Sequence, residues 1–319
     1  MKKQPFQKNL LVTLATSKYL ILAKQLFSSV YFNAGWKGDY MLLASQVPEK
    51  HLKWFREKGI LVKKCKPFYK QKGGDENEKG VNSRIGTLKF LLFTPEFKKW
   101  NNIVFLDSDI IVSASIDTLT KVRGFAAVPD SAGPLINQFV RQDDTNNALF
   151  RDLYQNYNLR KLSFNSGVLA FSSDIIKKNT FYQLKTLNRK YEKIRITSDQ
   201  MAFNLLFQKK WKRLPILYNS LLLVFFRMCQ KRLLKEGLET IILHFARHAE
   251  LFLQTVLTDI FFNEWKANFL KAELINTSKT LPAKSIWSTK KIKRFQNEYK
   301  KIYKFYRLKF WSKFKKAKF

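Results

Sequence analysis

The stretch Asn102-Ile103-Val104-Phe105-Leu106-Asp107-Ser108-Asp109 decides the fold of this 319-residue chain. Its apolar run is typical of a buried β-strand, and two acids follow the run at once. Ligands of α/β sheets bind at the carboxyl ends of the strands. Two carboxylates at such an end suit Mg²⁺ or Mn²⁺, which take oxygen ligands. Surface turns also use Asp freely, so it is the position after the strand that favours a metal site.

Strand-like and helix-like segments alternate before this stretch. The apolar patterns predict strands at 9–15, 40–44 and 60–63, and helices at 19–31, 48–58 and 83–93. This alternation predicts an α/β fold, with a mostly parallel sheet and helices on both faces. We expect residues 13–17 and 107–109 to lie together at the carboxyl edge of that sheet.

The second half of the chain carries shorter elements. Strands are predicted at 125–128, 167–171 and 240–245, with a helix at 199–208. One apolar stripe then suggests a helix packed on the main domain: Leu253, Val256, Leu257, Ile260, Phe261 and Trp265. We therefore expect a catalytic domain over residues 1–249 and a helical extension over 250–283.

The last segment, 284–319, is a basic aromatic tail. It holds 14 Lys or Arg and one acid, a net charge of +13. Apolar and aromatic residues recur there at steps of three and four: Ile292, Phe295, Tyr299, Tyr303, Tyr306, Phe310 and Phe314. Such an amphipathic helix predicts attachment to an anionic membrane surface. A helix packed on its own domain is an alternative, and a tail on nucleic acid is the less favoured one.

Composition limits the class of protein. The 59 Lys and Arg against 24 Asp and Glu leave a formal charge of +35, which suggests a polyanionic neighbour. Cys65 and Cys229 are too few for a disulfide framework or a zinc cluster, and they agree with a reducing cytosol. Polar residues interrupt the amino-terminal apolar stretch, which argues against a signal peptide. The longest apolar run, 221–226, is too short to cross a bilayer. We expect a cytoplasmic protein, peripheral on the inner face of the membrane.

Several motifs stand around the two acids in a fixed order. They are Leu11-Val12-Thr13-Leu14-Ala15-Thr16 with Tyr19, Arg84 with Lys89, Phe105-Leu106-Asp107-Ser108-Asp109, Phe164-Asn165-Ser166-Gly167-Val168 with Asp130 upstream, Ser198-Asp199-Gln200, and Leu243-His244-Phe245. Together they resemble the glycogenin-like retaining glycosyltransferases (glycosyltransferase family 8). The resemblance spans residues 9–248 and leaves out the tail.

The resemblance implies a Rossmann-like nucleotide-sugar transferase fold of the GT-A type and a role for each motif. Leu14, Thr16 and Tyr19 are expected to grip the uracil and ribose of a UDP-sugar. Arg84 and Lys89 are expected near the diphosphate and sugar. Asp107, Ser108 and Asp109 are expected on the donor phosphates, with Asp107, Asp109 and His244 holding Mn²⁺ or Mg²⁺.

The remaining motifs imply the residues around the transferred sugar. Asp199, Gln200, Asn165 and Asp130 are expected to orient the sugar hydroxyls and stabilise positive charge in the transition state. The implied activity is transfer of a hexose from a UDP-hexose donor, with retention. The tail favours a membrane-borne acceptor, a lipopolysaccharide core or another glycolipid.

One motif departs from the family pattern. There, Gly and then Lys-Pro-Trp follow the metal-binding His, and the Lys touches the diphosphate. Here His244 is followed by Phe245-Ala246-Arg247, so Arg247 is our candidate for the phosphate contact. His244 alone would more often be a core histidine, and a zinc site with His248 lacks a third ligand.

Two other functions are weighed against a transferase. A haloacid dehalogenase-like phosphohydrolase also has an apolar strand ending in Asp-x-Asp, but it places this near the start of its domain and adds a later acidic cluster. A non-enzymatic protein that binds membranes or nucleic acid would explain the charge. That alternative leaves the ordered acids, Asn165-Ser166-Gly167 and His244 without a role.

Overall fold

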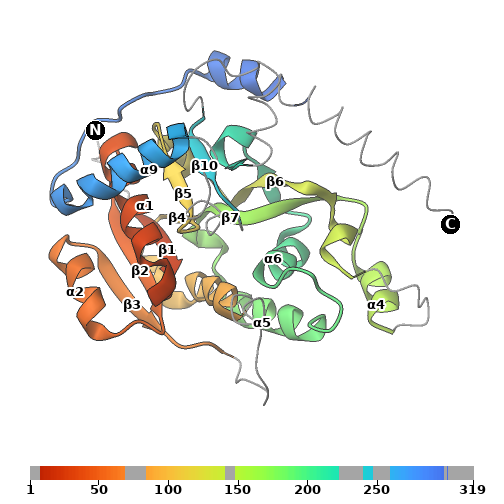
Figure 1. Ribbon diagram of the computed structural model, residues 1–319. Helices are drawn as coiled ribbons and strands as arrows, with labels where there is room; N and C mark the ends of the chain where they lie inside the picture. Colours follow the sequence, from red (N-terminus) through yellow and green to blue (C-terminus); the bar gives the residue numbers. More distant parts are fainter. Residues whose placement is uncertain are drawn as a thin grey trace, which may run out of the picture.

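Seven strands form the central sheet, in the order β3-β2-β1-β4-β7-β6-β8 (Figure 1). The computed structural model describes residues 8–68, 84–140, 148–222, 240–246, 259–297 and 300. The strands are β1 Asn9–Ala15, β2 Asp39–Ser45, β3 Leu61–Cys65, β4 Asn102–Leu106, β6 Phe125–Pro134, β7 Leu162–Ser172 and β8 Trp211–Arg213. Strands β3, β2, β1 and β4 run parallel, β7 is antiparallel to both β4 and β6, and β8 is parallel to β6. The predicted mostly parallel α/β sheet is confirmed.

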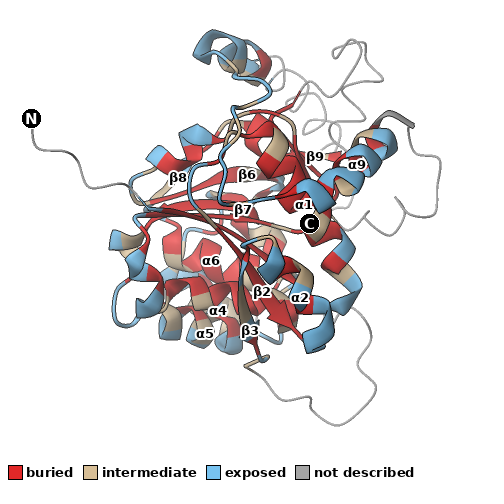
Figure 2. Ribbon diagram, turned by 90° about the vertical axis from the view of Figure 1, so that its left-hand side faces the viewer, coloured by how far each residue is buried: buried red, intermediate tan, exposed pale blue. Residues whose placement is uncertain are grey.

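Helices cover both faces of this sheet (Figure 2). On one face, α1 (Leu20–Asn33) and α2 (Glu49–Glu57) pack on alternate residues of β1, β2 and β4. On the other, η2 (Thr87–Phe93), α5 (Thr180–Lys190) and α6 (Asp199–Phe207) cover the intervening residues. Every residue of β1 and β4 is buried, because both sides are covered. This explains why both read as continuous apolar runs.

The other elements are short. They are α4 (Ala148–Asn156) and the 3₁₀ helices η1 (Ser17–Tyr19), η3 (Pro95–Lys99), η4 (Asp117–Lys121), η5 (Leu135–Gln138), η6 (Ser173–Ile175), η7 (Ile216–Tyr218) and η8 (Ala272–Leu274). The helix expected over 83–93 is a 3₁₀ helix from Thr87 onward. Strands β6 and β7 are longer than expected, and two register irregularities interrupt their pairing.

A small second sheet completes the region that positions the site. It has the order β5-β10-β9, with β5 Ile110–Val112, β9 Ser220–Leu221 and β10 Ile242–His244. Strand β10 is antiparallel to β5, with His244 opposite Ile110. Because β5 begins directly after Asp109, this register carries His244 to the acids at the end of β4.

Helix α9 (Asp259–Lys271) packs across α1 (Figure 1). Phe261 and Trp265 are buried against the core, as the apolar stripe predicts. The stripe's earlier members, Leu253, Val256 and Leu257, and the side chain of Ile260 lie outside the described residues. Among the helices that the structure describes, none is long and apolar enough to cross a membrane.

The described part of the basic tail, residues 284–297, lies against the catalytic domain. Lys284 N–H donates to Asn33 O, and Ser115 N–H donates to Ser285 O. Trp287 and Ile292 pack on the main core, and Phe295 is buried there. This part of the apolar face therefore covers the domain itself, and the rest of the face, from Tyr299 onward, lies outside the described residues.

Candidate metal and donor site

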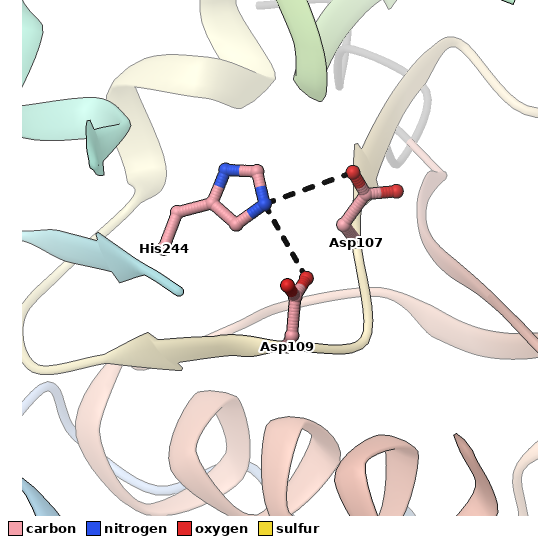
Figure 3. A group of neighbouring side chains, drawn as sticks. All are labelled: Asp107, Asp109 and His244. Carbon is pink, nitrogen blue, oxygen red and sulfur yellow. Dashed lines mark ion pairs between the residues drawn. The ribbon is translucent and has the colours of Figure 1, made fainter. Parts of the chain in front are cut away.

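Two acids and one histidine meet at the carboxyl end of β4. His244 Nε2 lies 3.3 Å from Asp109 Oδ1 and 3.8 Å from Asp107 Oδ2 (Figure 3). The turn between β4 and β5 presents both carboxylates, and β10 presents the imidazole from the opposite side. One ligand atom from each of the three residues falls within 4.8 Å of the other two.

These three groups fit a divalent cation. Two carboxylate oxygens and an imidazole nitrogen are a donor set that Mn²⁺ accepts, and Mg²⁺ shares the preference for the carboxylates. His244 is buried, and its Nδ1 lies 2.8 Å from Asn219 Oδ1, the outer-shell contact that metal-binding histidines usually make. Asp107 and Asp109 keep partial exposure, so one side of the site is open to ligands.

Lys89 ties the metal acids to the sugar side of the site. Its ammonium lies 2.9 Å from Asp107 Oδ1 and 3.0 Å from Asp199 Oδ2, donates to Ser166 O, and sits over the ring of Phe105. Burial alone would lower the pKa of Lys89, but the two carboxylates outweigh burial and raise it. Lys89 is therefore a permanent buried cation between Asp107 and Asp199.

Burial and the neighbouring cations act in opposite directions on the other charged groups. Burial raises the pKa of Asp107 despite the opposing charges of Lys89 and His244. The pKa of Asp109 is lowered, because His244 outweighs burial, and Lys89 lowers the pKa of Asp199 against burial in the same way. The pKa of His244 is raised, because the two acids overcome its desolvation. Asp107 and Asp109 thus favour the protonated form of His244.

A chain of amide side chains continues from Asp199 along the edge of the sheet. Ser166 Oγ donates to Asp199 Oδ2, and Ser166 N–H donates to Gln200 Oε1. Gln200 Nε2 donates in turn to Asp130 Oδ2 at 2.7 Å, and Asn165 Nδ2 donates to Gln200 Oε1. Four predicted sugar-site residues therefore belong to one connected network with Lys89.

Glycine is required at two points beside this network. A Cβ built on Gly167 would lie 2.2 Å from His244 Cε1, so only glycine lets the imidazole approach β7. A Cβ on Gly86 would lie 2.7 Å from Asp199 Oδ1, so the backbone before η2 runs directly past that carboxylate.

The other predicted residues are placed as follows. Leu14, Thr16 and Tyr19 lie at the carboxyl end of β1, and the register that pairs Val12 with Phe105 carries that end alongside Asp107. Ser108 is buried between the two acids, and Arg84 is half-buried two residues before Gly86. Arg247 lies outside the described residues.

The residue that sequence reasoning misses is Asn219. It is almost fully buried between η7 and β9, where it contacts both His244 and Asn165. No motif or periodicity marks it, because it is a single Asn in an irregular segment. The only available signal is the general need of a metal-binding His for a partner at its second nitrogen.

The part of the chain that carries these residues also matches a known family. A family model described as glycosyl transferase family 8 matches residues 10–250. Glycosyltransferase GlyB of Streptococcus pneumoniae serotype 4 is 30% identical over 135 residues, which are 41% of this chain and 27% of GlyB.

Solved structures share the fold at low sequence identity. The galactosyltransferase LgtC, solved with donor and acceptor sugar analogues, has a TM-score of 0.56 at 14% identity, over 86% of this chain and 97% of LgtC. The bifunctional glycosyltransferase WbbM has a TM-score of 0.55 at 15% identity, over 87% of this chain and 53% of WbbM. The chain thus spans about a quarter of GlyB and about half of WbbM.

Proposed function

The chain belongs to glycosyltransferase family 8, and from this premise we propose that it transfers a hexose from a UDP-sugar to an acceptor hydroxyl with retention. The observation that carries the proposal is the meeting of Asp107, Asp109 and His244 beside the Lys89–Asp199 pair. Family membership makes the chain a glycosyltransferase. This activity argues against the two alternatives considered above, a phosphohydrolase and a non-enzymatic binding protein.

The metal side of the site serves the leaving group. Asp107, Asp109 and His244 would hold Mn²⁺ or Mg²⁺, which supplies charge neutralisation for the departing diphosphate, a contribution of several kcal/mol. The partial exposure of Asp107 and Asp109 supports binding of the donor phosphates beside them.

Lys89 is our first candidate for a contact with the donor phosphates. It is already fixed between Asp107 and Asp199, so its charge needs no reorganisation when the donor arrives. Arg84 and Arg247 complete our proposed set of phosphate contacts. For these two the support is the order of motifs in the sequence.

The sugar side is served by the amide and acid network. Asp199 and Asp130 carry negative charge next to the positions where an oxocarbenium-like sugar would develop positive charge. Gln200 accepts a hydrogen bond from Asn165 and donates one to Asp130, and Gln200 and Asn165 would orient the sugar hydroxyls. At the end of β1, Leu14, Thr16 and Tyr19 would receive the uracil and ribose, and Ser108 would face the donor between the metal acids.

We propose a glycolipid, such as a lipopolysaccharide core, as the acceptor, and a cytoplasmic location on the inner face of the membrane. The support is the net charge of +13 over residues 284–319. Since Phe295 and Gln296 take part in the fold, a test of membrane attachment must keep them. A chain ending at residue 300 keeps both residues and still removes eight of the 14 tail cations. Sedimentation with anionic liposomes then compares the attachment of this chain with that of the full chain.

The catalytic proposal is tested by donor turnover. The full chain is incubated with Mn²⁺ and a panel of UDP-sugars, and the release of UDP is measured. We expect one sugar to be preferred, its turnover to stop with EDTA, and Asp109→Asn to abolish it. Asp117→Asn is the matched control and should stay active, because Asp117 is an exposed acid that forms an ion pair with Lys121. Metal-independent turnover, or equal rates in both variants, would contradict the proposal.

A further inference from the structure

Asn219 contacts His244 at the ring nitrogen that faces away from the two acids, and the two ends of its side-chain amide contact different residues. Its Oδ1 lies 2.8 Å from His244 Nδ1, and its Nδ2 donates to Asn165 Oδ1 at 2.8 Å. Which end of the amide faces His244 decides whether Nδ1 of the ring donates or accepts. The hydrogen-bond chain around Asn165 settles that orientation.

Two backbone groups provide the fixed points. Gly167 N–H can only donate, and it lies 2.9 Å from an Asn165 side-chain atom, which must therefore be Oδ1. Ser166 N–H likewise makes the nearby Gln200 atom Oε1, so the other end of the Asn165 amide, which reaches Gln200 Oε1, must be the donor Nδ2. Both backbone donors assign Asn165 in the same way.

The assignment then passes to Asn219 and to the ring. Because Asn165 Oδ1 is an acceptor, the Asn219 atom that meets it must be Nδ2. The Asn219 atom at His244 is then Oδ1, which accepts only, so Nδ1 of His244 must carry a proton. In the neutral ring this leaves the lone pair on Nε2, the atom that faces Asp107 and Asp109.

We propose that Asn219 is a positioning residue that holds His244 as the Nδ1–H tautomer, with Nε2 ready to bind a metal. The proposal deepens the proposed function and rests on it for the role of the metal. A histidine binds a metal only through an unprotonated nitrogen, and the hydrogen bond at the other nitrogen selects which one that is.

The local fold keeps Asn219 in place. Its own N–H donates to Ile216 O, and the next residue, Ser220, pairs with Leu243 of β10 and bonds Thr240 through the two hydroxyls. Ile216 N–H in turn donates to the side chain of Gln296. The described part of the tail thus supports the segment that presents Asn219.

The first test reads the tautomer directly. Long-range ¹H–¹⁵N NMR of the metal-free full chain, at a pH where the ring is neutral, reports which nitrogen carries the proton. The chain has three histidines, and His244→Gln identifies the signal. We expect the proton on Nδ1 in the wild type and in Asn219→Asp, which keeps an acceptor for it, and a mixture of tautomers in Asn219→Leu. A proton on Nε2 in the wild type, or an unchanged tautomer in Asn219→Leu, would overturn the proposal.

The second test measures metal affinity. We expect Mn²⁺ affinity, followed by electron paramagnetic resonance, to fall about 10- to 100-fold in Asn219→Leu and less in Asn219→Asp. Asn268→Leu is the matched control, because Asn268 is also buried and hydrogen-bonded but lies on α9, facing Asn33 of α1. Equal Mn²⁺ affinity in Asn219→Leu and Asn268→Leu would also overturn it. The tautomer is measured without donor or turnover, so its result stands even if no UDP-sugar is consumed.

Discussion

Gly167→Ala should disable the metal site by displacing His244 rather than by removing it. The new Cβ would lie 2.2 Å from His244 Cε1 and 2.8 Å from Nδ1, whereas ordinary contacts begin at 3.4 Å. The ring must therefore retreat by roughly 1 Å. The backbone adds no strain, since Gly167 is not among the residues with positive φ.

A displacement of this size exceeds what a metal site tolerates. Ligand distances have to agree with their ideal values within about 0.2 Å. Loss of an outer-shell partner costs about 10- to 100-fold in metal affinity, and here the ligand itself moves. We therefore expect Mn²⁺ affinity to fall by about 100-fold, or about 2.8 kcal/mol.

Electron paramagnetic resonance of Mn²⁺ titrations measures this directly. Overpacking also destabilises a fold by about 1–3 kcal/mol, so the control is a second overpacking change on β7, Ala170→Val, at a fully buried position that faces Val104. We expect the control to lose stability without losing Mn²⁺ affinity. Equal Mn²⁺ affinity in the two variants would mean that the position of the His244 ring does not control metal binding.

Three further predictions concern charge and packing. Lys89→Met should lower the free energy of unfolding by about 3–5 kcal/mol in urea titrations, because it leaves Asp107 and Asp199 without their buried cation, and Mn²⁺ should restore part of the loss. The pKa of His244 is raised in the folded protein, so its positive charge stabilises the metal-free fold. This stabilisation is complete below the pKa of the unfolded chain, about 6.5, and is lost as the pH rises through the pKa of the folded protein. His244→Gln should therefore lower the melting temperature more in acid than in alkali, and a constant difference would be against it. Phe295→Ala should cost about 3–5 kcal/mol of unfolding free energy, whereas ending the chain at residue 300 should cost far less.

The sequence predicts best where both faces of an element are buried. Strand β4 has the expected bounds because an uninterrupted apolar run ending in acids has few other structures open to it. The segment 87–93 is a 3₁₀ helix instead of an α-helix, since apolar spacing does not distinguish helices of similar pitch over two turns. Strands β6 and β7 exceed their predicted lengths because Pro129 and the irregular register break the alternation that marks a strand.

The candidate site divides in the same way. The order of motifs places Asp107, Asp109 and His244 in one site, and the β5–β10 register shows how the chain brings them together. Asn219 lies outside every motif, because its role depends on two side-chain contacts and on no pattern along the chain. The tail shows a different limit. An amphipathic face can pack on a membrane or on the protein's own core equally well. Phe295 packs in the protein's own core.

We propose that Asp107, Asp109 and His244 hold the divalent metal that the donor diphosphate uses. It is tested most directly by counting Mn²⁺ ions bound per chain, with and without UDP, in the wild type and in Asp109→Asn and His244→Gln. We expect one bound ion in the wild type, held more tightly with UDP, and loss of that ion in both variants. Wild-type binding of Mn²⁺ in either variant, or no effect of UDP on Mn²⁺ affinity, would contradict it.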